Sequence, residues 1–285
     1  MANVNGGLVS NQSKNQNLQT MVHPKNILAN ETMKKKFTEI LGKKAPGFMA
    51  SIISLYNSDN KFQNVDGYSV VNSALLAATL DLPINKEFGF AWVIPYGKQA
   101  QFQIGYKGYI QLALRTGQYK NLNVIEIYKG QLKSFNPLTE EIELNIEEKS
   151  SDEVIGYAFY MRLLNGFEKT IYWPIAKVEA HAKRFSKTFK SGPWQTDFDA
   201  MAKKTVMKNG LSKWGILSVE MQKAIEVDQA TINKEITNIE NLEHGDLNYP
   251  DNPENGNVVE VPYSNENNIK DKEQQGDMFS STPFN

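Results

Sequence analysis

The chain has 285 residues, of which 40% are hydrophobic and 22% charged, and its formal net charge at pH 7 is −1. A chain of this length can bury one substantial core or two smaller ones, as soluble globular proteins do. It has no cysteine, which excludes disulfides, thiol catalysis and cysteine-based zinc sites. No stretch approaches the roughly 20 apolar residues of a membrane span, and the N-terminus lacks the apolar run of a secretory signal, so we expect a cytoplasmic protein.

The small net charge conceals an uneven distribution along the chain. Residues 226–285 contain 13 acidic residues and 3 lysines, which leaves 28 basic and 19 acidic residues in 1–225. A segment with a net charge of −10 therefore follows one of +9. This asymmetry favours a body that binds a polyanion and carries an acidic appendage, although a solubilising tail on an ordinary enzyme is the alternative.

The N-terminal part of the chain is predicted to be helical after a disordered start. Residues 1–24 are rich in Asn, Gln, Ser and Gly, a composition that is too polar to fold by burial. Apolar residues at helical spacing then predict helices over 31–41, 46–56 and 68–80. The third of these is almost wholly apolar after its expected cap, Ser69, so we expect it to be central.

Alternating and aromatic segments predict strands in the middle of the chain. They cover residues 88–96, 100–104, 122–129, 141–146, 154–164 and 167–173. The connections between them are short, which implies an antiparallel sheet. A helix over 174–185 and a last helix from about Pro193 complete an α+β fold with helices packed on the sheet. We expect one core over residues 25–228, followed by a flexible acidic tail over 229–285.

A cationic stripe lies on the helix that is predicted to follow Gly105. At 100° per residue, Lys107, Gln111 and Arg115 fall within one narrow arc, and apolar residues fill most of the remaining circumference. Solvated helix faces usually mix charges of both signs, whereas this one has two cations and no nearby acid. The stripe therefore predicts contact with an anion.

The last predicted helix carries further lysines. Lys203 has Asp199 four residues before it, so these two can pair. Lys204 and Lys208 lie one turn apart without a local acid, and we expect a phosphate to compensate them. We also expect Lys204 and Arg115 to converge in one channel.

Other basic residues lie among aromatic ones or in turns. Arg184 and Lys187 alternate with phenylalanines in a stretch without acids, and Lys98 lies in the predicted hairpin turn. Single-stranded nucleic acid binds such surfaces, because cations follow the phosphates while rings accept bases. For any one of the aromatic residues, packing in the core is the better interpretation.

Few motifs point to catalysis. The glycines at 105 and 108 could shape a turn that holds a phosphate, but the Walker pattern is absent, so no ATP hydrolysis is expected. The three histidines are scattered and suggest neither a metal site nor a catalytic triad. The acidic residues from Glu140 to Glu153 could bind magnesium in a nuclease, but a solvated rim is the better interpretation. We therefore predict no catalytic and no metal-ligating residues.

Two motifs carry a resemblance to a known family. Residues 103–118 read QIGYKGYIQLALRTGQ, and GPW at 192–194 is followed by DAMAKKT at 199–205. From about residue 26 to 228 the chain resembles the RecT family of single-strand annealing proteins. This resemblance implies an α+β annealing-protein core and a phage or prophage recombinase that acts in a bacterial cytoplasm.

The resemblance also implies activity and partners. The protein would bind single-stranded DNA made by a 5′-to-3′ exonuclease, anneal it to a complementary strand without ATP, and assemble into rings or helical filaments. No cofactor would be required, with magnesium only as a counter-ion of DNA. Outside the resemblance, the acidic and aromatic tip at 277–284 could bind a replication or exonuclease partner or a host single-strand-binding protein, but a disordered spacer is the better interpretation. The alternatives are a metal-dependent nuclease and a passive module that protects single strands.

Eleven residues are the predicted DNA contacts. Six follow from the family motifs: Gln103, Tyr106, Lys107, Arg115, Lys203 and Lys204. Five follow from charge or polarity placement: Lys98, Gln111, Arg184, Lys187 and Lys208.

Overall fold

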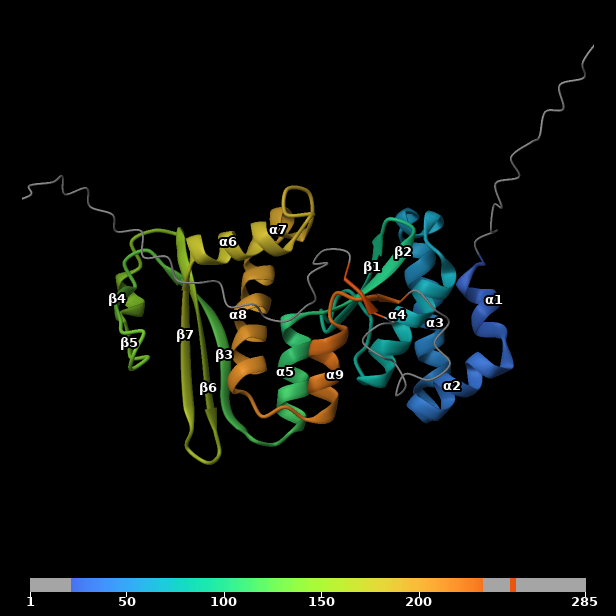
Figure 1. Ribbon diagram of the computed structural model, residues 1–285, viewed down its shortest axis with the longest axis horizontal. Coiled ribbons are helices and arrows are strands. Elements are labelled where there is room, and N and C mark those ends of the chain that lie inside the picture. The colour runs from blue at the N-terminus through green and yellow to red at the C-terminus, as the bar shows by residue number, and fades with distance from the viewer. Residues whose placement is uncertain (1–21, 233–246, 250–285) are drawn as a thin grey trace, which may run out of the picture.

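The computed structural model describes residues 22–232 and 247–249. It has an α+β fold, as predicted, with antiparallel strands and packed helices. A helical lobe with a β-hairpin and a lobe built on a three-stranded sheet lie at opposite ends, with α5 and α9 between them (Figure 1). One continuous hydrophobic cluster runs through both lobes. Among the described residues, no helix is long and apolar enough to cross a bilayer.

The helical lobe is built around one buried helix. Its helices are α1 (Pro24–Ala29), α2 (Glu31–Leu41), α3 (Ala45–Ser58) and α4 (Gly67–Thr79), with 3₁₀ turns at Gly42–Lys44 and Asn60–Asn64. The helix α4 is central, as predicted, and 11 of its 13 residues are buried. Its cap is Asp66, whose carboxylate accepts from the N–H groups of Tyr68 and Ser69, so the expected cap Ser69 was wrong. The Ser69 hydroxyl instead accepts from Ala100 N, which ties the hairpin to this lobe.

The hairpin consists of β1 (Ala91–Tyr96) and β2 (Gln99–Ile104), paired in antiparallel register from Ala91 opposite Ile104 to Tyr96 opposite Gln99. Only Gly97 and Lys98 form its turn, and Gly97 has a φ of 60°, a value that glycine adopts without strain. The strand β2 packs on α4, and its last residue leads through Gly105 into α5 (Tyr106–Arg115). The predicted hairpin and the helix predicted to follow Gly105 are thus confirmed.

The second lobe is a twisted sheet with strand order β3-β6-β7. The strands are β3 (Tyr119–Tyr128), β6 (Val154–Leu163) and β7 (Glu168–Pro174), and a small separate hairpin joins β4 (Leu132–Phe135) to β5 (Ile142–Leu144). The strand β4 was not predicted. A 3₁₀ turn, Ile146–Glu148, leads on toward β6. The helices α6 (Ile175–Phe185) and α8 (Phe198–Trp214) pack on the sheet. The helix α8 lies so close to it that a Cβ on Gly210 would collide with the Phe159 ring, so glycine is needed at this position.

The C-terminal part differs from the prediction. The single helix that was expected from Pro193 is interrupted, because α7 (Pro193–Thr196) ends at Asp197, which has a non-helical backbone and whose carboxylate caps α8. A further helix, α9 (Val219–Val227), was not predicted. Beyond it, β8 (Thr231–Ile232) and β9 (Leu247–Asn248) form an antiparallel pair in which all residues but Asn248 are buried, so ordered structure extends past the expected boundary at 228. The rest of the predicted tail, the tip included, lies outside the described residues, as do residues 1–21.

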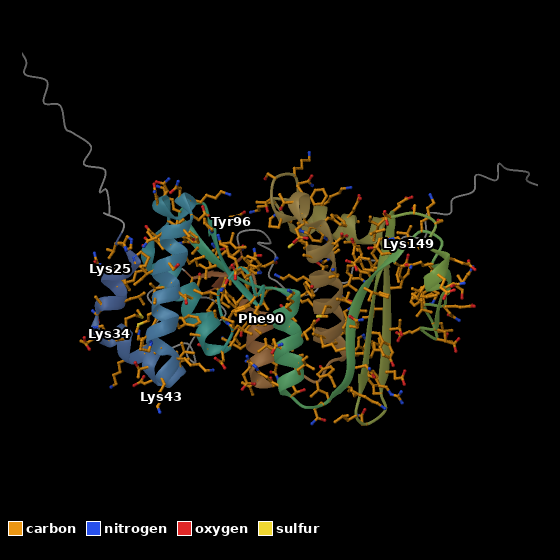
Figure 2. All side chains as sticks on the ribbon, turned by 180° about the vertical axis from the view of Figure 1, so that it is seen from behind. Lys25, Lys34, Lys43, Phe90, Tyr96 and Lys149 are labelled. Carbon is orange, nitrogen blue, oxygen red and sulfur yellow. The ribbon has the colours of Figure 1, made fainter. Side chains whose placement is uncertain are left out.

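Charged side chains at the far end of the helical lobe lie well away from the junction of the lobes. Lys25, Lys34 and Lys43 project outward from this end (Figure 2). Substituting these lysines would change the net charge of the protein without altering the junction of the lobes.

Candidate nucleic-acid interface

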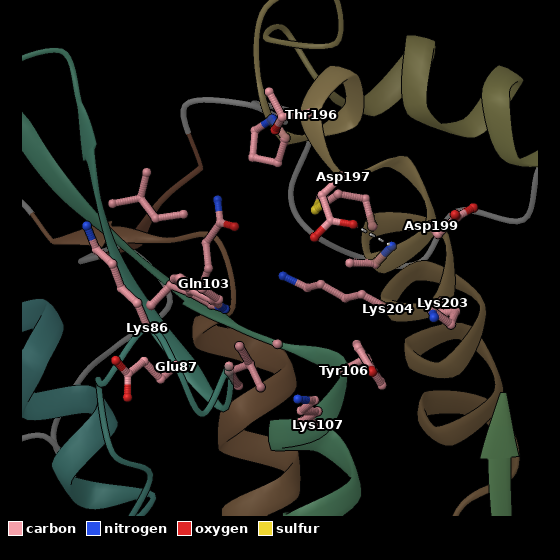
Figure 3. Close-up of a pocket in the computed structure, with 18 of the residues that line it drawn as sticks. Lys86, Glu87, Gln103, Tyr106, Lys107, Thr196, Asp197, Asp199, Lys203 and Lys204 are labelled. Carbon is pink, nitrogen blue, oxygen red and sulfur yellow. Dashed lines mark hydrogen bonds between the residues drawn. The ribbon is translucent and has the colours of Figure 1, made fainter. Parts of the chain in front are cut away.

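A pocket of about 740 Å³ lies where the two lobes meet, and we call it the interlobe pocket (Figure 3). One wall comes from the hairpin and the start of α5, including Trp92, Gln103 and Tyr106. The opposite wall comes from α7 and the first turns of α8, including Asp197 and Lys203. The two sequence motifs, about 90 residues apart, thus face each other across one space.

Five of the eleven predicted contacts line the interlobe pocket: Gln103, Tyr106, Lys107, Lys203 and Lys204. The other six do not: Lys98, Gln111, Arg115, Arg184, Lys187 and Lys208. Lys98 is exposed at the hairpin turn, and Arg184 and Lys187 are exposed around the end of α6. Whether any of the eleven contacts DNA stays a prediction.

The interlobe pocket is mixed in charge rather than uniformly basic. Four lysines and four carboxylates line it: Lys86, Lys107, Lys203 and Lys204, with Glu87, Glu126, Asp197 and Asp199. Several of these acids have partners within the protein. The Tyr157 hydroxyl donates to Asp199, and Asp197 caps α8.

Lys203 forms an ion pair across the pocket wall, with a partner that was not predicted. Its ammonium lies 2.6 Å from the carboxylate of Glu126 on β3, not beside Asp199. Burial alone would raise the pKa of Glu126, but the hydrogen bond and the charge of Lys203 outweigh it and hold the pKa below its ordinary value. The same ammonium lies 5.4 Å from the centre of the Tyr106 ring. The pair therefore joins the wall of α8 to the sheet.

Lys204 and Lys208 share one carboxylate, so the expectation that they lack a compensating acid was wrong. Both ammonium groups lie 3.0 Å from Asp228, whose side chain is completely buried. The backbone N–H of Ile104 and the Tyr109 hydroxyl donate to the same carboxylate, at 2.9 and 3.0 Å. Burial would raise the pKa of Asp228, but the two lysines and the N–H hold it at about 2, so the group is ionised at neutral pH. We call these five groups the Asp228 cluster.

The two glycines before and within α5 serve packing rather than a phosphate cradle. A Cβ on Gly105 would collide with the carbonyl oxygen of Gly89, and a Cβ on Gly108 would collide with that of Phe90. The segment before β1 therefore occupies the space beside both glycines. Close approach of two backbones is the reason that glycine is needed here.

Comparison with known proteins agrees with this arrangement. The RecT family matches residues 46–241, more than half of the chain. The chain belongs to the RecT family. It is 59% identical over 215 residues to the uncharacterized protein YqaK of Bacillus subtilis (strain 168), covering 75% of each chain. It is 29% identical over 175 residues to Protein RecT of Escherichia coli (strain K12), covering 58% of this chain and 64% of that protein.

Membership in the RecT family indicates a role in DNA recombination or annealing, and it implies binding of single-stranded DNA and self-association. Both motifs that face the interlobe pocket lie inside the matched residues. The recognition of the family from these motifs is confirmed.

Lys86 and Trp92 are among the residues of the interlobe pocket that were not predicted for this RecT-family chain. Lys86 precedes the hairpin, and Trp92 is a partly buried residue of β1. Lys86 lies outside the predicted helices and strands, and Trp92 lies within the predicted strand 88–96, where an aromatic residue is ordinary. Their distance in sequence from α8 left no local signal that they face it.

Arg115 does not converge with Lys204, contrary to expectation. Its guanidinium donates to the carbonyl oxygens of Leu80 and Asp81 at 2.6 and 2.8 Å, at the end of α4. It lines a separate hollow of about 280 Å³ together with Glu220. Arg115 therefore satisfies carbonyl groups that the end of a helix leaves without donors.

We expect Arg115→Ala to lower the free energy of unfolding by about 0.5–1.5 kcal/mol, because it removes a donor from two carbonyl groups that water can replace only in part. The dependence of oligonucleotide binding on salt should stay unchanged. Urea unfolding and binding titrations at several salt concentrations measure the two effects. Unchanged stability with a smaller salt slope would instead assign Arg115 to DNA, as the motif suggested.

His181 is predicted to make the protein sensitive to mild acid. Burial, with the charges of Lys208, Arg184 and Lys177, lowers its pKa from 6.5 to about 4, and its Nδ1 has no hydrogen-bond partner among the described residues. The unfolded chain therefore takes up this proton at a higher pH than the folded one. The free energy of unfolding should fall between pH 6.5 and pH 4, by about 3 kcal/mol from this group.

The variant His181→Phe isolates this effect, because the ring lies against Trp173 and Phe185 and an aromatic replacement suits that site. Urea unfolding should show that the free energy of unfolding falls less from pH 7.5 to pH 4.5 in the variant than in the wild type. Equal losses in both proteins would contradict the assignment. Asp228 does not interfere, because its stabilising contribution is lost only as the pH falls below about 3.8 toward 2.

The acidic residues between Glu140 and Glu153 do not converge on one point. Four of them are paired with separate lysines: Glu140 with Lys169, Glu148 with Lys133, Asp152 with Lys149, and Glu153 with Lys129. In residues 22–232 and 247–249, no group of three or more His, Cys, Asp or Glu side chains is arranged to hold a metal. This arrangement agrees with a solvated rim and gives no support to the nuclease alternative.

Proposed function

We propose that the protein binds single-stranded DNA in the interlobe pocket and anneals complementary strands during recombination, without nucleotide hydrolysis. The observation that carries this proposal is the meeting of the two family motifs on opposite walls of the interlobe pocket. Lysines from both walls reach it, and Tyr106 and Trp92 provide ring faces beside them. Cations that follow phosphates and rings that accept bases are the general means of binding single strands.

Annealing by this route needs no acid, base or nucleophile. Two backbones have to be brought together with their repulsion screened, while the bases remain able to test pairing. Contacts to phosphates do not depend on sequence, so base pairing with the second strand provides the sequence specificity, and the protein neutralises and positions the two backbones. Magnesium enters the proposal only as a counter-ion of DNA.

Self-association completes the proposal, since one interlobe pocket can hold only a short stretch of a strand. Rings or helical filaments would align successive pockets into a groove, to which Arg184 and Lys187, exposed around the end of α6, would add charge. A 5′-to-3′ exonuclease would supply the single strands, and a phage or prophage recombination system is the proposed setting. A host single-strand-binding protein is the proposed partner of the C-terminal tip.

Two end-labelled complementary oligonucleotides, mixed with the protein and no nucleotide, test this function. We expect faster formation of full-length duplex than without protein, with and without magnesium. Strands that stay single but resist an added nuclease would support the passive protecting module. Shortened strands in magnesium would support the nuclease.

A further inference from the structure

The buried carboxylate of Asp228 accepts hydrogen bonds from both walls of the interlobe pocket. Its carboxylate accepts from Ile104 N at the end of β2 and from the Tyr109 hydroxyl on α5, which belong to one wall. It accepts from Lys204 and Lys208 on α8, which belongs to the other. Ile104 and Lys204 themselves line the interlobe pocket. In Figure 3 the Lys204 side chain extends from α8 toward the hairpin.

The chain that follows Asp228 holds this carboxylate in place. Gln229 N donates to Phe102 O at 2.9 Å, and Phe102 N donates to Ala230 O at 3.2 Å, so the segment runs along β2 like an added strand. Gln229 has a φ of 70°, a left-handed value that is strained for a residue other than glycine. The Gln101 side chain donates to Gln229 O at 2.6 Å and secures this turn. The backbone is thus bent to bring the carboxylate under the pocket.

The Asp228 cluster also sets a local charge. Its two ammonium groups carry one positive charge more than the carboxylate that they share. The Tyr109 hydroxyl stays neutral, because burial and the negative charge of Asp228 raise its pKa well above the ordinary value. Substituting Asp228 or Lys208 therefore changes the charge around Lys204 without altering a residue that lines the interlobe pocket.

We propose that Asp228 is a positioning residue for strand binding, which fixes Lys204 between the two walls of the interlobe pocket and sets the charge that Lys204 presents to a phosphate. This inference rests on the proposed function, because it takes the interlobe pocket as the site of the strand. Asp228 is buried and acts only through Lys204 and the two walls.

Asp228→Asn and Asp228→Glu separate this role from a purely structural one. The asparagine keeps the size but removes the charge, so the ammonium groups of Lys204 and Lys208 lack a counter-charge, and their mutual repulsion favours the loss of one proton as the pH rises. We expect binding of a labelled oligothymidine by Asp228→Asn to weaken progressively from pH 7 to pH 9. Asp228→Glu keeps the charge, so its binding should stay flat with pH, like that of the wild type.

The other titratable groups around the cluster do not produce such a profile. Tyr249, which follows β9, donates to Glu226 O, and burial and the charges of Glu226 and Asp228 raise its pKa to about 12. His181 on α6, near Lys208, has a pKa of about 4. Neither changes its protonation between pH 7 and pH 9.

Lys208→Met tests the proposal even if Asp228→Asn does not fold. Lys208 does not line the interlobe pocket. Without it, the negative charge of Asp228 is no longer shared and neutralises the positive charge of Lys204 alone. We expect the slope of log binding constant against log salt to fall by up to about 0.7, the value for one phosphate of a single strand. The control Lys213→Met removes the same charge from an exposed site at the end of α8 and should leave the slope unchanged.

Salt-independent binding by the wild type would overturn the proposed function itself. Salt-dependent wild-type binding with a flat pH profile for a folded Asp228→Asn, or an unchanged slope for Lys208→Met, would overturn the positioning role alone. Urea unfolding of each variant, under the binding conditions, shows which proteins are folded.

Discussion

Replacement of Asp228 by alanine is expected to lower the free energy of unfolding by about 3–5 kcal/mol, a large fraction of the stability of a typical domain. The reason is the loss of one acceptor for four donors in a completely buried place. Lys204, which is buried, and Lys208, which is partly buried, would remain without a counter-charge. Urea unfolding followed by circular dichroism measures the change.

Asp152→Ala is the matched control for this prediction. Asp152 also pairs with a lysine, Lys149, but its side chain is 96% exposed, so its loss should leave the unfolding midpoint unchanged. A loss below about 1 kcal/mol for Asp228→Ala would show that water or a rearranged lysine replaces the carboxylate. The cluster would then not hold the two walls together.

The double variant Lys86→Gln/Lys107→Gln is expected to weaken binding of single-stranded DNA strongly without unfolding the protein. Both lysines line the interlobe pocket, and Lys107 is exposed. If each meets one phosphate, the slope of log binding constant against log salt falls by about 1.4. If the variant and the wild type have the same binding constant at 1 M salt, the variant binds about 25-fold more weakly at 0.1 M salt. Fluorescence anisotropy of a labelled oligothymidine measures both quantities.

Lys25→Gln/Lys43→Gln is the control, because it makes the same change in net charge at the far end of the helical lobe (Figure 2). We expect its salt slope to equal that of the wild type. Equal losses in the two double variants would mean that DNA responds to the overall charge, and the interlobe pocket would then not be the binding site.

Local periodicity predicted the elements that bear the site. The alternation up to Ile104, the break at Gly105 and the helical spacing to Arg115 depend only on neighbouring residues, and the hairpin and α5 formed as predicted. Five predicted contacts line the interlobe pocket: Lys107, which lies on the stripe that periodicity indicated, and Gln103, Tyr106, Lys203 and Lys204, which follow from the family motifs. Periodicity thus predicted the elements of the site but not the orientation of the whole stripe, because Gln111 and Arg115 do not line the interlobe pocket.

The partners of the charged residues could not be predicted from local spacing. Asp228 lies 24 residues from Lys204 and 119 from Tyr109, and it begins a stretch whose composition indicates an acidic tail. Arg115 reaches carbonyl groups 35 and 34 residues earlier, because α4 happens to end beside α5. In both cases an apparently uncompensated cation has its partner on another element, which only the folded chain brings near.

The break between α7 and α8 shows a second limit of periodicity. Trp194 and Phe198 pack edge to face at 5.3 Å and belong to one apolar stripe, as the helical spacing indicated. The chain nevertheless leaves the helical conformation at Asp197, whose carboxylate then caps the new helix. A buried stripe can thus continue across a break in the backbone.

The most direct test of the proposed function is the rate at which the protein anneals two complementary oligonucleotides without a nucleotide. We expect the wild type and Lys25→Gln/Lys43→Gln to accelerate duplex formation equally, and Lys86→Gln/Lys107→Gln to lose most of this acceleration at 0.1 M salt while remaining folded. Annealing by the pocket variant at the wild-type rate would contradict the assignment of strand binding to the space between the lobes.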